Sequence, residues 1–292
     1  MKKAILTAVA ALVVAGSANA AIVLTESFSA APAPGTFIEL IEGSAANAEI
    51  VYAFDYATLS IPSAPRSTGG STTGLSLRSN ISAAAVSTVG VYTSASYSGD
   101  YQVTVDVYPY LNPAGPTGTS EYANFGINHS GTRQISFQQA VSTSTDGYWL
   151  TFRTDASAND SIIFQEGFTT AFSDNEYPGL VWADSSDGSV AGGARKGNAT
   201  PFAQSFFGAG GVFVNQWKTI QIKQEAGIVT ASIDGAPLFT RNDPDDTWTS
   251  GRVLLGGDDP FASVNADIRV IYDNLLVETI VASDATNWTS YY

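Results

Sequence analysis

Polar and aromatic side chains recur at alternate positions of several extended segments, and apolar residues fill the positions between them. In 121–129, for example, Phe125 and Ile127 alternate with Asn124 and Asn128. Successive side chains of a β-strand point to opposite faces, so the polar set is expected on the face away from the core. The residues that share this parity are Tyr108, Asn124, Asn128, Gln138, Trp149 and Arg153.

These side chains have the chemistry of sugar recognition. A flat ring such as that of Trp149 offers an apolar platform, and amides supply paired donors and acceptors for hydroxyl groups. If the strands are neighbours in one sheet, the sequence predicts a glycan-binding face. Trp182, in the long irregular stretch 172–209, is expected to lie over that face. The alternative interpretation is an ordinary solvated face with Trp149 covered by a loop.

Catalysis on such a face would need other groups. A retaining glycosidase uses two carboxylates about 5 Å apart, and carboxylates two residues apart on a strand share a face. Glu39 and Glu42 have the wrong spacing for this, and the sequence leaves open whether carboxylates of separate strands meet. A polysaccharide lyase needs a base, for which His129 is the candidate. The alternative places His129 at a strand end beside the Ser130-Gly131 turn.

The segments that would position these residues are strands. Alternation with a period of two, interrupted by Gly, Pro, Asn and Asp, is typical of half-buried antiparallel strands. Such strands are expected over 101–108, 121–129, 133–141, 147–153, 219–224, 228–234, 252–256 and 267–278. Many short strands in one stretch predict an all-β fold, a two-sheet antiparallel β-sandwich of jelly-roll type.

Residues 1–20 have the layout of a secretory signal peptide. Two lysines precede an uncharged apolar run, which ends at an A-x-A cleavage motif over 18–20. The run is shorter than the roughly 20 residues that a membrane-spanning helix needs. We therefore expect cleavage before Ala21 and a secreted protein, extracellular or periplasmic. The remainder is expected to form one domain over 21–282 and a polar tail over 283–292.

Charge and composition narrow the choice of partner. The chain has 27 Asp and Glu residues against 13 Lys and Arg, a net charge of −14. An acidic surface repels nucleic acid and anionic lipid. With no Cys and one His, the chain offers neither a disulfide scaffold nor a zinc site of the His/Cys type. The expected partner is a polysaccharide or glycoconjugate rather than a nucleic acid, and no membrane span is expected.

From residue 212 onward, the order of motifs resembles the laminin-G-like, or concanavalin A-like, jelly-roll family. Trp217 opens a strand, the next hairpin ends in Asp234-Gly235, and a glycine-flanked strand covers 251–257. The closing strand carries an Asp-Asn pair at 273–274. The resemblance implies a β-sandwich with one structural Ca²⁺ between the first and last strands. Glu26 and Asp273 are the positions that match its ligands.

The resembled family includes sugar-binding modules, adhesion domains, glycoside hydrolases and polysaccharide lyases, so the fold alone does not select a function. The residues favour a secreted, non-catalytic β-sandwich that binds glycans or adheres to a surface. A secreted carbohydrate-active enzyme on the same fold is one alternative. A structural protein of the extracellular matrix is the other.

Overall fold

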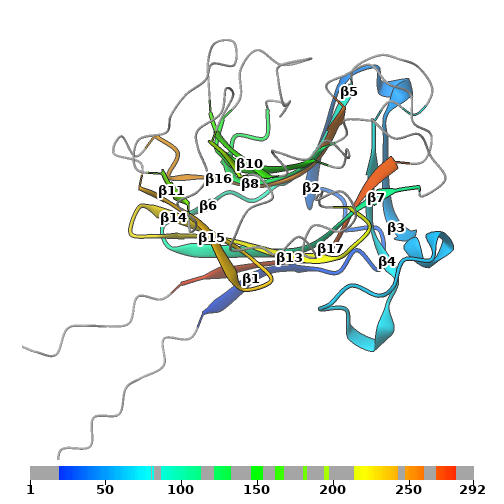
Figure 1. The fold of residues 1–292 in the computed structure, drawn as a ribbon, viewed down its shortest axis with the longest axis horizontal. Coiled ribbons are helices and arrows are strands. Elements are labelled where there is room, and N and C mark those ends of the chain that lie inside the picture. Colours follow the sequence, from blue (N-terminus) through cyan, green and yellow to red (C-terminus); the bar gives the residue numbers. More distant parts are fainter. Residues whose placement is uncertain are drawn as a thin grey trace, which may run out of the picture.

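Two antiparallel sheets lie face to face in the computed structural model (Figure 1). The structure describes residues 20–79, 81, 87–112, 122–132, 146–153, 162–167, 180–182, 194–196, 214–242, 247–259 and 268–280. The predicted all-β, two-sheet antiparallel sandwich is therefore confirmed. The predicted strand over 133–141 lies outside the described residues.

The nine-stranded sheet contains the first and last strands of the chain. Its strands, in spatial order, are β11 (Leu180–Trp182), β15 (Ala236–Asn242), β14 (Ile228–Ile233), β13 (Lys218–Glu225), β7 (Tyr101–Leu111), β17 (Ile268–Thr279), β4 (Thr73–Arg78) and β3 (Glu49–Asp55). The ninth strand, β1 (Ala21–Glu26), pairs antiparallel with β17. Ala21 lies opposite Thr279, so the two ends of the described chain are neighbours.

The eight-stranded sheet covers the other side of the core. Its strands, in spatial order, are β12 (Ala194–Lys196), β10 (Ile162–Glu166), β9 (Tyr148–Arg153), β8 (Tyr122–His129), β16 (Ser250–Asp259), β5 (Ser87–Thr93) and β2 (Phe37–Gly43). The short strand β6 (Tyr97–Ser98) pairs with β16. Figure 1 shows this sheet curving, with its concave side turned away from the nine-stranded sheet.

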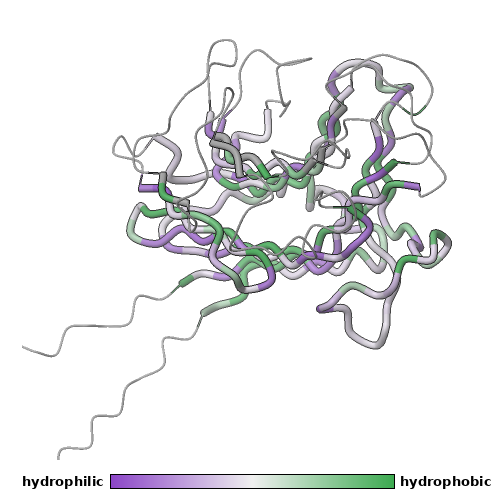
Figure 2. The backbone as a smooth tube through the Cα atoms, in the orientation of Figure 1, coloured by the Kyte–Doolittle hydropathy of each residue, from purple (hydrophilic) through white to green (hydrophobic). Residues whose placement is uncertain are grey.

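The main core fills the space between the sheets. Along β7, Val103, Val105 and Val107 are fully buried, and Phe125 and Ile127 of β8 meet them from the other sheet. Hydrophobic and hydrophilic residues alternate along the strands of both layers (Figure 2). The alternation that predicted these strands is thus the alternation between core and outer face.

Residues 56–72, here called the strap, join β3 to β4 and lie on the outer face of the nine-stranded sheet. They contain two short 3-10 helices, Tyr56–Leu59 and Thr68–Gly70, and a third, Ala45–Asn47, precedes β3. Under the strap, Tyr56 and Ile61 pack with Tyr108 of β7 and Ile271 of β17 in a second, smaller apolar cluster. Within the described part of the chain, no helix has the length and apolar character needed to cross a membrane.

Candidate functional site

The outer face of the eight-stranded sheet carries a row of aromatic side chains. Tyr92 of β5 pairs with Leu254 of β16, Leu254 with Gly126 of β8, and Gly126 with Trp149 of β9. Residues paired across antiparallel strands share a face. The His129 ring lies between the other two rings, 5.9 Å from Tyr92 and 6.0 Å from Trp149, measured between centroids. The side chains of this row, those of Tyr92, His129, Trp149 and Leu254, are fully buried.

A β-bulge in β8 places His129 in this row. His129 pairs with Arg252 and Gly126 with Leu254, so two residues of β8 lie opposite one residue of β16. The extra residue reverses the parity of the strand beyond it. Gly126 makes room for the imidazole, because a Cβ there would lie 2.5 Å from His129 Nε2.

Next to the aromatic row lies a polar row. It crosses four neighbouring strands: Gly90 of β5 pairs with Gly256 of β16, Gly256 with Asn124 of β8, and Asn124 with Thr151 of β9. Asn124 Nδ2 donates to Asp258 Oδ1 at 2.7 Å, and Thr151 Oγ1 donates to Asn124 Oδ1 at 2.7 Å. These bonds orient the amide, because its nitrogen and oxygen are engaged by different partners.

His129 is held by a buried carboxylate. Its Nδ1 lies 3.3 Å from Asp146 Oδ1, and the Ser130 backbone N–H donates to Asp146 Oδ2 at 3.2 Å. Burial alone would raise the pKa of Asp146. The hydrogen bond and charge of His129, with the bonds from Ser130, outweigh burial and hold that pKa below its usual value. When the imidazole is neutral, the bond to Asp146 keeps its proton on Nδ1, and Nε2 is left as an acceptor.

The structure divides the predicted binding residues between two sheets. Asn124 and Trp149 lie on the outer face of the eight-stranded sheet, as their parity predicted, but both are buried. Tyr108 belongs to the nine-stranded sheet, where its ring lies 5.2 Å from that of Trp217. The assumption that all these strands are neighbours in one sheet was wrong, because alternation assigns a residue to a face and not to a sheet.

Asn128 also departs from the predicted face. At the bulge its φ is 64°, and its side chain turns toward the nine-stranded sheet. There its Oδ1 accepts a hydrogen bond from the Tyr101 hydroxyl at 2.6 Å, and its Nδ2 donates to Gln224 Oε1 at 2.7 Å. His129, two residues beyond the inward-facing Ile127, takes the outer position instead.

For three predicted binding residues the structure describes at most the backbone position. Arg153 ends β9 in the eight-stranded sheet, and Trp182 ends β11 at the edge of the nine-stranded sheet. The side chains of both lie outside the described part of the chain, as does all of Gln138.

Sequence reasoning missed Tyr92 and Asp258, which complete the two rows. All seven residues of β5 are buried, so its sequence has no alternation that would identify Tyr92 as an outer residue. The strand predicted over 252–256 stops short of Asp258, whereas β16 extends to Asp259. The pair of glycines that face each other, Gly90 and Gly256, is the sequence signal that could have pointed to this face.

The predicted calcium ligands lie on opposite faces of the nine-stranded sheet. Glu26 is paired with Leu275 on the core-facing side, and its Oε1 accepts a hydrogen bond from the Phe28 backbone N–H at 2.8 Å. Asp273 faces the strap, and burial raises the pKa of its carboxyl to about 6. The two carboxylates therefore do not fit a single ion that both would coordinate. Among the described residues, no group of three or more His, Cys, Asp or Glu side chains could hold a metal ion.

No protein-family model matches the chain, and no curated protein matches its sequence. Among solved structures, a protein of unknown function with a galectin-like fold from Bacillus subtilis has 12% identity and a TM-score of 0.52, over 89% of this chain and 97% of that one. The carbohydrate-binding module CBM66 from Bacillus subtilis has 14% identity and a TM-score of 0.39, over 80% and 96% of the two chains.

Peanut lectin bound to a nine-residue peptide has 8% identity and a TM-score of 0.43, over 88% of this chain and 98% of that one. The first similarity, with the strand order described above, shows that the chain adopts a galectin-like β-sandwich fold.

Proposed function

We propose that this chain is a secreted, laminin-G-like, non-catalytic glycan-binding module, and that the outer face of the eight-stranded sheet is its binding site. One observation carries the proposal. The rings of Tyr92, His129 and Trp149 form a row directly beside the hydrogen-bonded row of Asn124, Thr151 and Asp258. An aromatic platform flanked by oriented polar groups is the combination that sugar recognition needs.

The two rows would contact different parts of a sugar. The apolar face of a pyranose ring would lie against the Trp149 ring. Its hydroxyl groups would exchange hydrogen bonds with Asn124 and Asp258 in the polar row, and one hydroxyl would donate to His129 Nε2, which has no hydrogen-bond partner among the described residues. Because carboxylates line the site, a neutral sugar is favoured over a uronate.

Burial of the rows has a consequence for binding. A ligand must displace the atoms that cover Trp149 and Asn124, which are 0% and 1% exposed. Stacking gains about 25 cal/mol per Å² of apolar area removed from water, but association itself costs several kcal/mol. We therefore expect micromolar to millimolar affinity for a single site.

A glycan array followed by calorimetric titration tests the proposal. Trp149→Leu keeps an apolar side chain but removes the flat ring, and we expect it to weaken binding at least about tenfold. The matched control is Trp217→Leu on the other sheet, which should bind as the wild type does. If Trp149→Leu does not fold, the indole N–H signal of Trp149 in the wild-type NMR spectrum should still shift with ligand. A glycan that binds without moving that signal would place the site elsewhere.

The His129–Asp146 pair favours a carbohydrate-active enzyme as the second candidate. A carboxylate that orients an imidazole through Nδ1 leaves Nε2 as a general base, which is the arrangement that proton abstraction requires. Assays for new reducing ends and for unsaturated products, run on the polysaccharides that bind, distinguish the two functions. Turnover that is lost in His129→Gln would favour the enzyme, and binding without turnover favours the module.

A further inference from the structure

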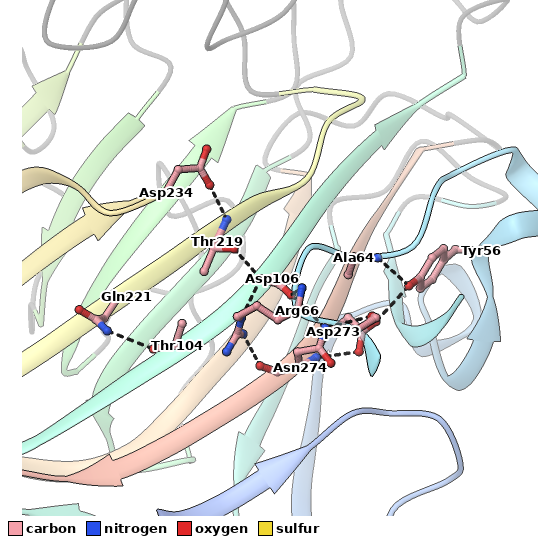
Figure 3. Close-up of polar contacts among 11 residues, drawn as sticks. Tyr56, Ala64, Arg66, Thr104, Asp106, Thr219, Gln221, Asp234, Asp273 and Asn274 are labelled. Atoms are coloured by element: carbon pink, nitrogen blue, oxygen red, sulfur yellow. Dashed lines mark hydrogen bonds and ion pairs between the residues drawn. The ribbon is translucent and has the colours of Figure 1, made fainter. Parts of the chain in front are cut away.

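The strap is fixed to the nine-stranded sheet by a guanidinium group (Figure 3). Arg66 Nε donates to Asp106 Oδ1 at 3.0 Å, and the Arg66 backbone N–H donates to Asp106 Oδ2 at 3.2 Å. Its Nη2 donates to the carbonyl oxygen of Asn274. One side chain of the strap thus joins β7 to β17.

The Asn274 carbonyl comes from a β-bulge in β17. Asp273 pairs with Asp106 and Leu276 with Thr104, so two residues of β17 oppose one residue of β7. A bulge leaves its extra residue outside the regular ladder. Asn274 has a φ of 53°, and besides its carbonyl bond to Arg66 its Nδ2 donates to Asp106 Oδ2 at 2.9 Å. The bulge is therefore held by the same groups that hold the strap.

Two carboxylates meet at this point, and both are buried. Asp106 is 0% exposed and also accepts from Thr219 Oγ1 at 2.7 Å. Asp273, its cross-strand partner, accepts from the Tyr56 hydroxyl at 3.0 Å and from Ser67 Oγ at 2.9 Å. Two buried carboxylates on neighbouring strands are unfavourable unless a cation offsets their charge. The guanidinium of Arg66 supplies that charge through its ion pair with Asp106.

We propose that Arg66 takes the place of the structural calcium ion that the laminin-G-like resemblance implies. The carboxylate of Asp106 and the carbonyl oxygen of Asn274 accept hydrogen bonds from a guanidinium here, and Glu26 and Asp273 do not fit a shared ion. A guanidinium remains charged at any pH at which the protein is folded, and its planar fork matches a carboxylate and a nearby carbonyl. Because this cation is part of the chain, closure of the strap does not depend on free Ca²⁺.

Thermal unfolding of the whole mature protein tests the proposal. Wild-type protein purified without chelator should have the same Tm in excess EDTA and in millimolar CaCl₂. Arg66→Gln should lower the Tm by about 3 °C or more, because it leaves a buried carboxylate uncompensated. The matched control is Arg252→Gln, which should lower the Tm by less than Arg66→Gln does. Among the described contacts, the Arg252 guanidinium donates to the carbonyls of Ser130 and Thr93 and to no carboxylate.

A double-mutant cycle separates charge compensation from mere packing. In an Asp106→Asn background the charge that Arg66 offsets is gone, so Arg66→Gln should then lower the Tm clearly less than it does in the wild type. If Arg66→Gln does not fold, Arg66→Lys keeps the charge without the fork and should fold with a Tm below that of the wild type. The proposal is overturned if EDTA lowers the wild-type Tm. It is also overturned if Arg66→Gln or Arg66→Lys has the same Tm as the wild type, or if Arg66→Gln lowers the Tm as much in the Asp106→Asn background as in the wild type.

Discussion

Asn128 decides which side chains of β8 reach the outer face. Its φ of 64° lies in the left-handed region, which Asn tolerates better than most residues, and three polar partners, two of them buried, hold it there. Besides Tyr101 and Gln224, the carbonyl of Trp248 accepts from Asn128 Nδ2 at 2.6 Å. One residue therefore both joins the two sheets and presents His129 on the outer face.

The first residue-scale prediction follows from these bonds. Asn128→Ala should lower the free energy of unfolding by about 2–4 kcal/mol, because it leaves buried polar partners unsatisfied. The matched control is Asn215→Ala, which replaces another Asn of positive φ that is exposed and bonded to the Leu111 backbone. We expect the control to cost under about 1.5 kcal/mol. Urea denaturation measures both, and equal losses would contradict the role given to Asn128.

The second residue-scale prediction concerns pH. The pKa of Asp146 is lowered in the folded protein, so its ionised form stabilises the fold above its unfolded pKa of about 3.9. That contribution is lost as the pH falls through the lower, folded pKa. Asp146→Asn should therefore destabilise the protein most near pH 7, and the difference from the wild type should shrink in acid. Denaturant titrations from pH 7 into acid measure the free energy of unfolding of both proteins. A difference between them that does not change with pH would contradict the lowered pKa of Asp146.

At the scale of elements, alternation identified strands in which apolar inward residues are separated by mainly polar outward ones. It found β7, β8, β9, β13, β14, β16 and β17, because their inward residues contact the core and their outward residues are polar. It did not find β5, whose outer positions include Gly90 and Tyr92 rather than a run of polar side chains, or β2 and β3, whose residues are mostly half-exposed. Sheet membership was beyond reach, since it depends on pairing between distant segments such as Tyr108 and Ile271.

A prediction at this scale tests the assignment of faces in β9. Phe152 is 0% exposed between the sheets, and Phe152→Ala should lower the free energy of unfolding by about 3–5 kcal/mol. The comparison is Ile228→Ala in β14, whose side chain is 37% exposed and should cost less than about 1.5 kcal/mol. Chemical denaturation measures both losses. A larger loss for Ile228→Ala than for Phe152→Ala would contradict the placement of Phe152 on the core-facing side of β9.

At the scale of the molecule, the first strand begins where processing is expected to end. Ala21 is the first residue of β1 and pairs with Thr279, so cleavage of residues 1–20 would leave the strand whole. We predict that protein recovered from outside the cytoplasm begins at Ala21, as N-terminal sequencing would show. Recovery of an intact Met1 in a membrane fraction would contradict this prediction.

The pairing of β1 with β17 also suits the domain to circular permutation and to insertion into another protein. Since the entry and exit points of the described chain are adjacent, a short linker can join residue 280 to Ala21 without crossing either sheet. New termini then fit in the exposed turn at Ala226–Gly227, between β13 and β14. The same adjacency suits the sandwich to insertion as a cassette within a surface loop of a host protein, where a single attachment point would carry both connections.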